Sequence, residues 1–140
     1  MEGFNHVIAI SVRSRDIDAW GHVNNAVYFT YLEQARVEYL MRVVLETDRH
    51  GPAGLAVILA EACCQFKRPI TYGQSVVVGT RAVRLGRSSL RLEHRIEADG
   101  ELAALGHSVV VHYDYQAGRS VPMPELYRAR IQSFEGRVLC

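Results

Sequence analysis

Two aspartates, Asp16 and Asp18, stand a few residues before a segment whose apolar side chains recur with helical spacing. A carboxylate at this place lies beside backbone N–H groups that have no partner within the helix, and beside the positive end of the helix dipole. The same N–H groups can bind the oxygen of a carbonyl and stabilise the negative charge that develops there. A carboxylate next to such a helix end is a minimal apparatus for hydrolysing an acyl group. The alternative is structural: the aspartates, with Asn24 and Asn25, only order a loop and cap the helix.

The segment after the aspartates is predicted to be a helix that begins near Asn24. Its main apolar residues recur at intervals of three and four, and therefore share one face: Tyr28, Tyr31, Leu32, Ala35, Tyr39 and Val43. Other apolar residues lie outside this face, so we expect the helix to be covered on more than one side, by a sheet that curls around it or by a second subunit. Asn24 or Asn25 is the natural N-cap, because an Asn side chain accepts a hydrogen bond from an unpaired backbone N–H.

The rest of the chain alternates between strand patterns and turn signals. Residues 48–54 contain glycines and a proline that break the helix. Residues 55–66 fit helix or strand by periodicity alone, and their β-branched content favours a strand. Apolar and charged residues alternate strictly over residues 90–97, and Asp99-Gly100 is a strong hairpin signal. The predicted elements are a first strand over residues 4–13 before the helix and four strands in antiparallel succession after it, over residues 55–66, 74–85, 90–97 and 101–115. A terminal helix is predicted over residues 122–134.

Composition narrows the class of protein. A chain of 140 residues is expected to form a single domain, residues 1–140. The formal net charge of +1 gives no general attraction to nucleic acid. No signal peptide is recognisable, and no apolar run approaches the roughly 20 residues that span a bilayer. We therefore expect a soluble, cytoplasmic protein with no membrane partner. The three cysteines fit neither zinc spacing nor a disulfide framework, and are expected to be buried free thiols.

The loop and the helix start share a pattern with a known family. The run D-x-D-x-x-G-H-V-N-N-x-x-Y, followed by E-x-A-R, resembles the signature of hotdog-fold thioesterases, and within them the 4-hydroxybenzoyl-CoA thioesterase group with its acyl-CoA and acyl-ACP relatives. The order of elements and the segment FKRPITYG (66–73) are also similar, so the resemblance covers residues 4–115. It implies an α+β hotdog fold, in which a curved five-stranded antiparallel sheet wraps around one long central helix, with active sites at a dimer interface.

Carried over by position, the resemblance implies roles for individual residues. The family's catalytic carboxylate is the second Asp of the D-x-D, Asp18, which acts as nucleophile or as general base on a water. His22 is similar to the catalytic histidine of plant acyl-ACP thioesterases, and the carbonyl-polarising amide comes from the helix start near Asn25. The sequence departs from the family twice: many bacterial members have a histidine where Asn25 stands, and the plant enzymes have an asparagine where Trp20 stands. Trp20 is therefore expected to contact the substrate in a different way.

Weaker functional signals lie within and after the second predicted strand. Lys67 and Arg68 either bind the phosphates of coenzyme A or form an ordinary exposed strand end. Glu61 is either a buried carboxylate that assists the site, or a residue that faces solvent or pairs with an arginine. The histidines of the later strands show no ligand spacing, so we expect no metal and no cofactor. No G-x-S-x-G elbow occurs, so the serine-hydrolase route is unsupported.

Together these patterns predict an acyl-CoA thioesterase that hydrolyses a fatty or aromatic acyl-CoA to the free acid and CoA. Two alternatives stay open: an acyl-ACP thioesterase of the same fold, and a non-catalytic hotdog domain that binds acyl thioesters as a sensor. The presence of both Asp18 and His22 argues against the sensor. The expected partners are the thioester substrate and further copies of the chain, as a homodimer or homotetramer.

Overall fold

Five antiparallel strands form one curved sheet in a computed structural model of the protein, which describes residues 1–46 and 56–140. Their spatial order is β1-β3-β4-β5-β2, and a short β6 pairs with the end of β5. The strands are β1 (His6–Ile10), β2 (Val57–Phe66), β3 (Val76–Leu85), β4 (Ser89–Ala98), β5 (Glu101–Asp114) and β6 (Arg119–Ser120). The predicted α+β architecture with a curved five-stranded sheet is confirmed.

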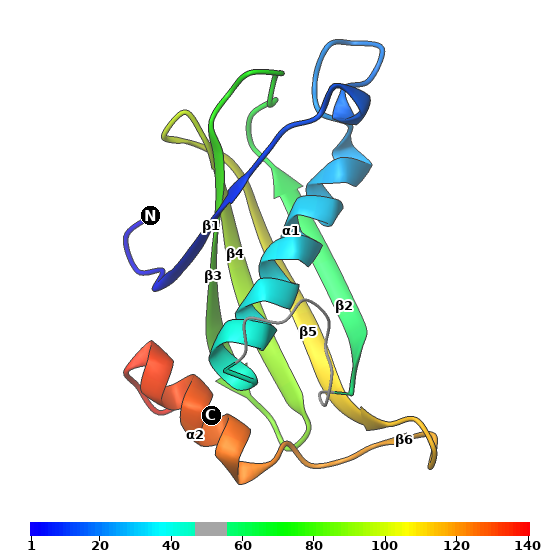
Figure 1. Ribbon diagram of the computed structural model, residues 1–140, viewed down its shortest axis with the longest axis vertical. Coiled ribbons are helices and arrows are strands. Elements are labelled where there is room, and N and C mark those ends of the chain that lie inside the picture. Colours follow the sequence, from blue (N-terminus) through cyan, green and yellow to red (C-terminus); the bar gives the residue numbers. More distant parts are fainter. Residues whose placement is uncertain (47–55) are drawn as a thin grey trace.

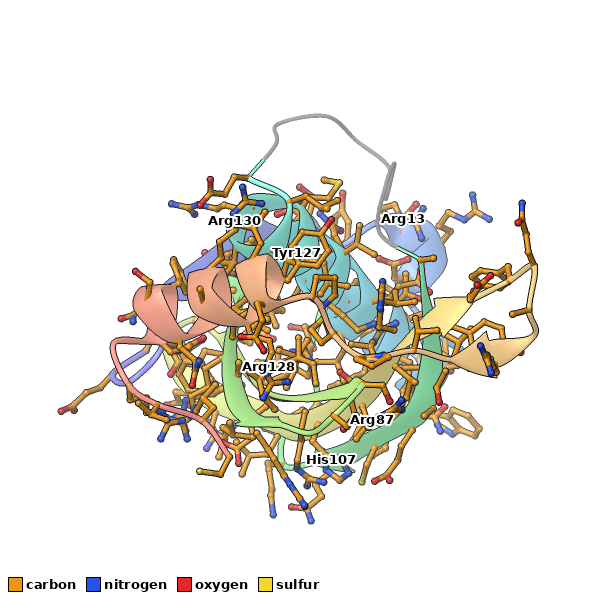
Figure 2. The ribbon with its side chains drawn as sticks, turned by 90° about the horizontal axis from the view of Figure 1, so that it is seen from below. Arg13, Arg87, His107, Tyr127, Arg128 and Arg130 are labelled. Atoms are coloured by element: carbon orange, nitrogen blue, oxygen red, sulfur yellow. The ribbon has the colours of Figure 1, made fainter. Side chains whose placement is uncertain are left out.

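One long helix, α1 (Asn25–Tyr39), lies across the concave face of the sheet and continues into a π-helical turn, Leu40–Val44 (Figure 1). Viewed from below, the sheet bends around α1 (Figure 2). The face predicted from the sequence is the face that is buried, in a core shared with β1, β3, β4 and β5. A second helix, α2 (Glu125–Glu135), packs against the π-helical turn and β3 at one end of the sheet.

The burial of side chains and the turns in the structure agree with the local patterns that predicted strands. Along β4 the side chains alternate between buried and partly exposed over the whole strand. Asp99 and Gly100 both have positive φ, 50° and 80°, and connect β4 to β5 as the hairpin signal predicted. The first strand is shorter than predicted, since only residues 6–10 of 4–13 pair with β3. The predicted end of the helix at residues 48–54 lies outside the described residues.

The position of β2 corrects the predicted succession of strands. β2 does not pair with β3, its neighbour in sequence, but with β5 at the opposite edge of the sheet. Tight hairpins connect β3 to β4 and β4 to β5. The connection between β2 and β3, residues 67–75, is too long to be a tight hairpin turn. The chain therefore crosses from one edge toward the other after β2. The terminal helix begins at Glu125 rather than at 122, because Pro124 occupies the N-cap position.

A row of buried polar side chains crosses the sheet beneath α1. His94 is 1% exposed, with Nδ1 3.0 Å from Thr80 Oγ1 and Nε2 3.0 Å from Ser108 Oγ. His6 is also 1% exposed, and its Nδ1 has no hydrogen-bond partner in the described part of the chain. Burial, reinforced by the positive charge of Arg36, lowers the pKa of His94 to about 3. Burial and the charge of Arg42 lower the pKa of His6 to about 4. Both imidazoles are therefore neutral in the folded protein at neutral pH.

These histidines predict a stability that decreases in mild acid. In the unfolded chain they bind protons below a pH of about 6.5, whereas the folded protein excludes those protons until about pH 4. The free energy of unfolding should therefore fall by about 4 kcal/mol between pH 7 and pH 5, as urea unfolding at each pH would measure. His94→Gln should make this dependence shallower, because it removes one of the two buried imidazoles. Equal pH dependence in the wild type and His94→Gln would contradict the assignment.

Candidate functional site

The loop before α1 is a small hairpin that fixes Asp18. Ile17 and Val23 form a bridge, and inside it the Asp18 N–H donates to the His22 carbonyl at 2.8 Å. Three residues close the turn, of which Gly21 has a φ of 82° and donates its N–H to the Asp18 carbonyl at 3.1 Å. A three-residue hairpin commonly ends in a residue of this left-handed conformation, which glycine adopts without strain. The local sequence thus determines the direction in which Asp18 points.

The carboxylate of Asp18 is held on one side only. Its Oδ1 accepts the Trp20 N–H at 2.9 Å and, more weakly, the His22 N–H at 3.4 Å. Its Oδ2 has no hydrogen-bond partner among the described residues, and the side chain is half-buried. One oxygen therefore orients the group, and the other is available for chemistry.

The start of α1 offers an unpaired backbone donor nearby. Asn24 is the N-cap, one of the two residues predicted for this position: its side chain accepts the Ala26 N–H at 2.9 Å, and its carbonyl accepts the Val27 N–H at 2.9 Å. The Asn25 N–H is left without an acceptor within residues 1–46 and 56–140. This N–H lies at the positive end of the dipole of a 15-residue helix. It is suited to bind an oxygen that carries negative charge.

A pocket of about 460 Å³ joins the loop, the helix start and the segment after β2. The six residues selected from the sequence all line it: Asp18, Trp20, His22, Asn25, Lys67 and Arg68. Figure 1 shows why segments so far apart in sequence meet, since the end of β2 lies beside the first turns of α1. Proximity alone does not test the role of any of these residues.

Two hydrogen bonds hold the segment after β2 against the helix start. The Val23 N–H donates to the Ile70 carbonyl at 2.8 Å, and the Tyr28 hydroxyl donates to the Arg68 carbonyl at 3.1 Å. The Phe66 ring packs edge-on against Tyr28 with 5.0 Å between ring centres. The walls of the pocket are thus fixed to each other by the backbone as well as by side chains.

Asp16 has a different environment from Asp18, although the two are separated by one residue. Asp16 is 1% exposed, and its carboxylate accepts hydrogen bonds from the Arg13 backbone and guanidinium and from the Tyr31 hydroxyl at 2.8 Å. Burial alone would raise the pKa of Asp16, but these hydrogen bonds outweigh it and hold that pKa below its usual range. The structural interpretation therefore applies to Asp16, which anchors the loop on α1. The family resemblance assigned the catalytic role to Asp18, but the sequence did not predict that Asp16 would be buried.

The remaining predicted residues are exposed to different degrees. Trp20 is 82% exposed at the rim of the pocket, and Lys67 and Arg68 are also exposed, with Arg68 in an ion pair with Glu101. The imidazole of His22 makes no direct hydrogen bond to Asp18 within the described chain, and the two residues are joined through their backbones.

Glu61 is not part of this site. Its side chain is 56% exposed and accepts a hydrogen bond from His107, 2.6 Å away, which excludes the alternative of a buried carboxylate assisting the pocket. It faces solvent, as the other alternative allowed, and its hydrogen-bond partner is His107. The described residues contain no group of three or more His, Cys, Asp or Glu side chains that could hold a metal ion. None of the described helices is long and apolar enough to cross a membrane.

Comparisons with known proteins cover most of the chain. The sequence model of the thioesterase-like superfamily matches residues 12–131. The crystal structure of a thioesterase from Thermus thermophilus, complexed with coenzyme A and Zn, is 45% identical, with a TM-score of 0.88 over 99% of this chain and 100% of that one. The chloroplastic acyl-acyl carrier protein thioesterase ATL3 of Arabidopsis thaliana is 28% identical over 92% of this chain and 68% of its own length. The L-carnitine dehydrogenase/betainyl-CoA thioesterase of Agrobacterium fabrum is 30% identical over 77% of this chain, which spans 22% of that protein.

The anchoring of Asp16 predicts a specific stability loss. Tyr31→Phe removes one hydrogen bond to a buried carboxylate without creating a cavity, and should lower the free energy of unfolding by about 1.5 to 3 kcal/mol in urea titrations. Tyr72→Phe is the matched control, because that ring is 66% exposed, and its effect should be close to zero. Equal unfolding free energies for the two variants would show that Asp16 does not depend on Tyr31.

Proposed function

Because the chain belongs to the thioesterase-like superfamily and is a thioester hydrolase, we propose that it hydrolyses acyl-coenzyme A at the pocket beside the start of α1. The observation that carries this proposal is the pairing of two groups across one pocket: the free Oδ2 of Asp18 and the unpaired N–H of Asn25. The first can deliver an oxygen to a carbonyl carbon, and the second can stabilise the charge on the carbonyl oxygen.

In the proposed reaction the thioester carbonyl oxygen accepts a hydrogen bond from the Asn25 N–H. Negative charge develops on that oxygen as the carbonyl carbon becomes tetrahedral, and the helix dipole stabilises it. Asp18 either attacks the carbon directly or takes a proton from a water that attacks it. The C–S bond then breaks, and coenzyme A leaves as a thiolate that takes up a proton. Attack by Asp18 gives an anhydride that water hydrolyses, whereas attack by water gives the free acid directly.

His22 has a supporting role in this proposal. Its imidazole is exposed at the pocket and lies in the same small hairpin as Asp18. Through one water the ring can orient the attacking oxygen or share its proton, a contribution usually worth about 10² to 10⁴ in rate.

The rim of the pocket supports recognition of coenzyme A. Lys67 and Arg68 lie at this rim, and Arg68 can exchange its exposed partner Glu101 for phosphate oxygens, which an arginine binds in a bidentate way. The exposed ring of Trp20 offers an apolar face to the substrate. Two relatives favour a CoA thioester, since one was solved with coenzyme A and another is named a betainyl-CoA thioesterase. Hydrolysis of acyl-ACP is the second candidate, because the similar Arabidopsis protein is named for that activity.

We also propose that the protein acts as a homodimer, or as a homotetramer built from such dimers. β2 is an edge strand of the described sheet, and Leu59 and Phe66 on it are each 47% exposed. On the neighbouring side of α1, Phe29 and Val37 are also partly exposed. An exposed edge of this length with apolar side chains favours pairing with another copy. Phe66 belongs both to this surface and to the pocket, so the proposed interface borders the active site.

The proposal also includes the domain organisation and the cellular compartment of the enzyme. Residues 1–140 are proposed to form one hotdog thioesterase domain that acts in the cytoplasm, in the metabolism of acyl thioesters. The three cysteines are free thiols, which supports a reducing compartment.

Loss of the Asp18 charge should abolish most of the activity. Asp18→Asn keeps the side-chain oxygen that accepts the Trp20 N–H but removes the carboxylate, and should lower kcat for acyl-CoA hydrolysis by at least about a hundredfold. Asp114→Asn is the matched control, because the Asp114 carboxylate also accepts backbone N–H groups of the turn that follows it, at the other end of the molecule. Near-normal turnover of a folded Asp18→Asn protein would contradict the mechanism.

Replacement of His22 separates a catalytic role from support of the loop. His22→Gln retains a donor and an acceptor, so a catalytic imidazole predicts a loss of about a hundredfold in kcat at saturating substrate with little change in Tm. A loss smaller than about threefold, with Asp18→Asn still inactive, would confine the chemistry to the carboxylate and the helix end.

The proposed interface predicts the mass in solution. Light scattering at micromolar concentration should give at least twice the mass of the chain. Leu59→Glu should reduce this mass, whereas Leu126→Glu, at an even more exposed position on α2, should leave it unchanged. A monomeric wild-type protein would refute both the dimer and an active site at its edge.

A further inference from the structure

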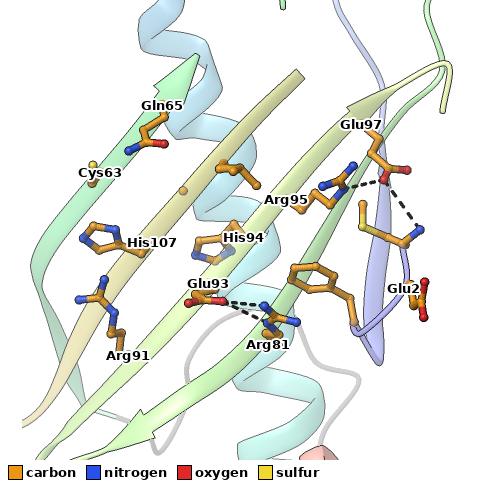
Figure 3. A pocket seen from close by; sticks show the side chains of 14 residues that line it. Glu2, Cys63, Gln65, Arg81, Arg91, Glu93, His94, Arg95, Glu97 and His107 are labelled. Carbon is orange, nitrogen blue, oxygen red and sulfur yellow. Dashed lines mark hydrogen bonds and ion pairs between the residues drawn. The ribbon is translucent and has the colours of Figure 1, made fainter. Parts of the chain in front are cut away.

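A second group of reactive side chains lies on the outer face of the sheet, away from α1. Cys64 packs against the core beneath α1, so its neighbour Cys63 points to the opposite face. The cross-strand partner of Cys63 is His107 on β5, and Glu61 is on the same side of β2. Figure 3 shows this face with the helix behind the sheet, and Figure 2 shows His107 on the outside of the curve. These residues share none of the pocket proposed for the thioester.

A thiol, an imidazole and a carboxylate lie at neighbouring positions of β2 and β5 on this face. Directly opposed residues on antiparallel strands bring their Cβ atoms to within about 5.5 Å, which places Cys63 beside the His107 ring. His107 also donates from Nε2 to Glu61 Oε1, 2.6 Å away. That hydrogen bond lowers the pKa of Glu61, so the carboxylate stays ionised and keeps the proton on Nε2. With Nε2 donating to Glu61, Nδ1 is the ring nitrogen that can accept a proton.

Cys63 and His107 line a cavity of about 650 Å³ that is rich in arginine, whereas Glu61 is not part of its lining. Two of its arginines are neutralised by ion pairs with Glu93 and Glu97. The third, Arg91, forms no ion pair within the described chain, and Figure 3 shows its guanidinium next to His107. The charge of Arg91 acts on the Glu61 carboxylate, but the two form no ion pair in the described chain, so the Arg91 guanidinium can bind an anionic group of a ligand beside Cys63.

We propose that Cys63 is a reactive thiol, activated by His107 and Glu61, that forms a mixed disulfide with anionic low-molecular-weight disulfides bound in this cavity. Cys63 gives its proton to Nδ1 of His107, and the thiolate attacks one sulfur of the ligand. The S–S bond of the ligand breaks, and a new S–S bond forms at Cys63. The other half of the ligand leaves as a thiolate and takes the proton from His107. The ligand is the oxidant, since the two electrons of the thiol end on the departing sulfur.

The other two cysteines of the chain serve as internal comparisons for the reactivity of Cys63. Cys64 faces the core, where burial and then the neighbouring Cys63 raise its pKa to about 11, so it is a poor nucleophile. Cys140 is exposed at the end of the chain. The expectation that all three would be buried is wrong, because Cys63 and Cys64 are only half-buried and Cys140 is exposed.

The proposal is tested by measuring the rate of thiolation at each cysteine. The protein is incubated with glutathione disulfide, an anionic probe, quenched in acid and mapped by peptide mass spectrometry. Cys63 should react at least about tenfold faster than Cys140, and His107→Gln should remove most of this advantage while the rate at Cys140 stays unchanged. Glu61→Gln should slow Cys63 in the same direction. A rate at Cys63 no greater than at Cys140, or one unaffected by His107→Gln, would overturn the proposal.

The charge of the ligand is tested separately. Arg91→Gln should slow the reaction of Cys63 with glutathione disulfide by several-fold but leave its reaction with the neutral 2-hydroxyethyl disulfide unchanged. Equal slowing of both probes, or of neither, would overturn the assignment of an anionic ligand. The rate at Cys64 in the same samples reports whether each variant remains folded, because unfolding would expose this half-buried thiol.

Discussion

The buried carboxylate of Asp16 is the interaction on which the site depends. It binds Arg13 before it and the Tyr31 hydroxyl on α1, so it ties the loop to the second turn of the helix. The Asp16 carbonyl also accepts the Asn24 N–H at 2.9 Å, which fixes where the helix begins. The position of Asp18 relative to the helix end follows from these contacts and from the small hairpin that contains it. An isolated carboxylate would be costly to bury, but that of Asp16 is stable here because both of its oxygens accept hydrogen bonds.

The proposed chemistry requires the structure to leave two groups unsatisfied. The Asn24 cap takes the N–H groups of Ala26 and Val27, and leaves that of Asn25 open. The hairpin likewise occupies only Oδ1 of Asp18. A fully capped helix beside a fully hydrogen-bonded carboxylate would be more stable but could not bind a carbonyl oxygen or attack its carbon. The anchor at Asp16 allows the residue two positions later to keep this reactivity.

Features set by local periodicity were predictable from the sequence, and features set by distant pairing were not. The buried face of α1, the alternation along β4 and the turn at Asp99 follow from short-range patterns. The edge position of β2 depends on which strand it meets, and no local signal specifies that. The cluster of Cys63, His107 and Glu61 was missed for the same reason, because β2 and β5 are far apart in the chain. The D-x-D-x-x-G-H-V-N-N motif identified the candidate residues of the loop and the helix start. The opposite environments of Asp16 and Asp18 depend instead on the burial of Tyr31.

The central claim is that Asp18 and the Asn25 N–H act on one thioester carbonyl, and a complex with a non-hydrolysable acyl-CoA tests it most directly. In an analogue that replaces the thioester sulfur by a methylene and keeps the carbonyl, a crystal structure would locate the reacting oxygen. The account predicts that this oxygen lies about 3 Å from the Asn25 nitrogen, with Asp18 Oδ2 facing the carbonyl carbon directly or through one water. A carbonyl bound away from Asn25, with another carboxylate as its nearest acid, would contradict it.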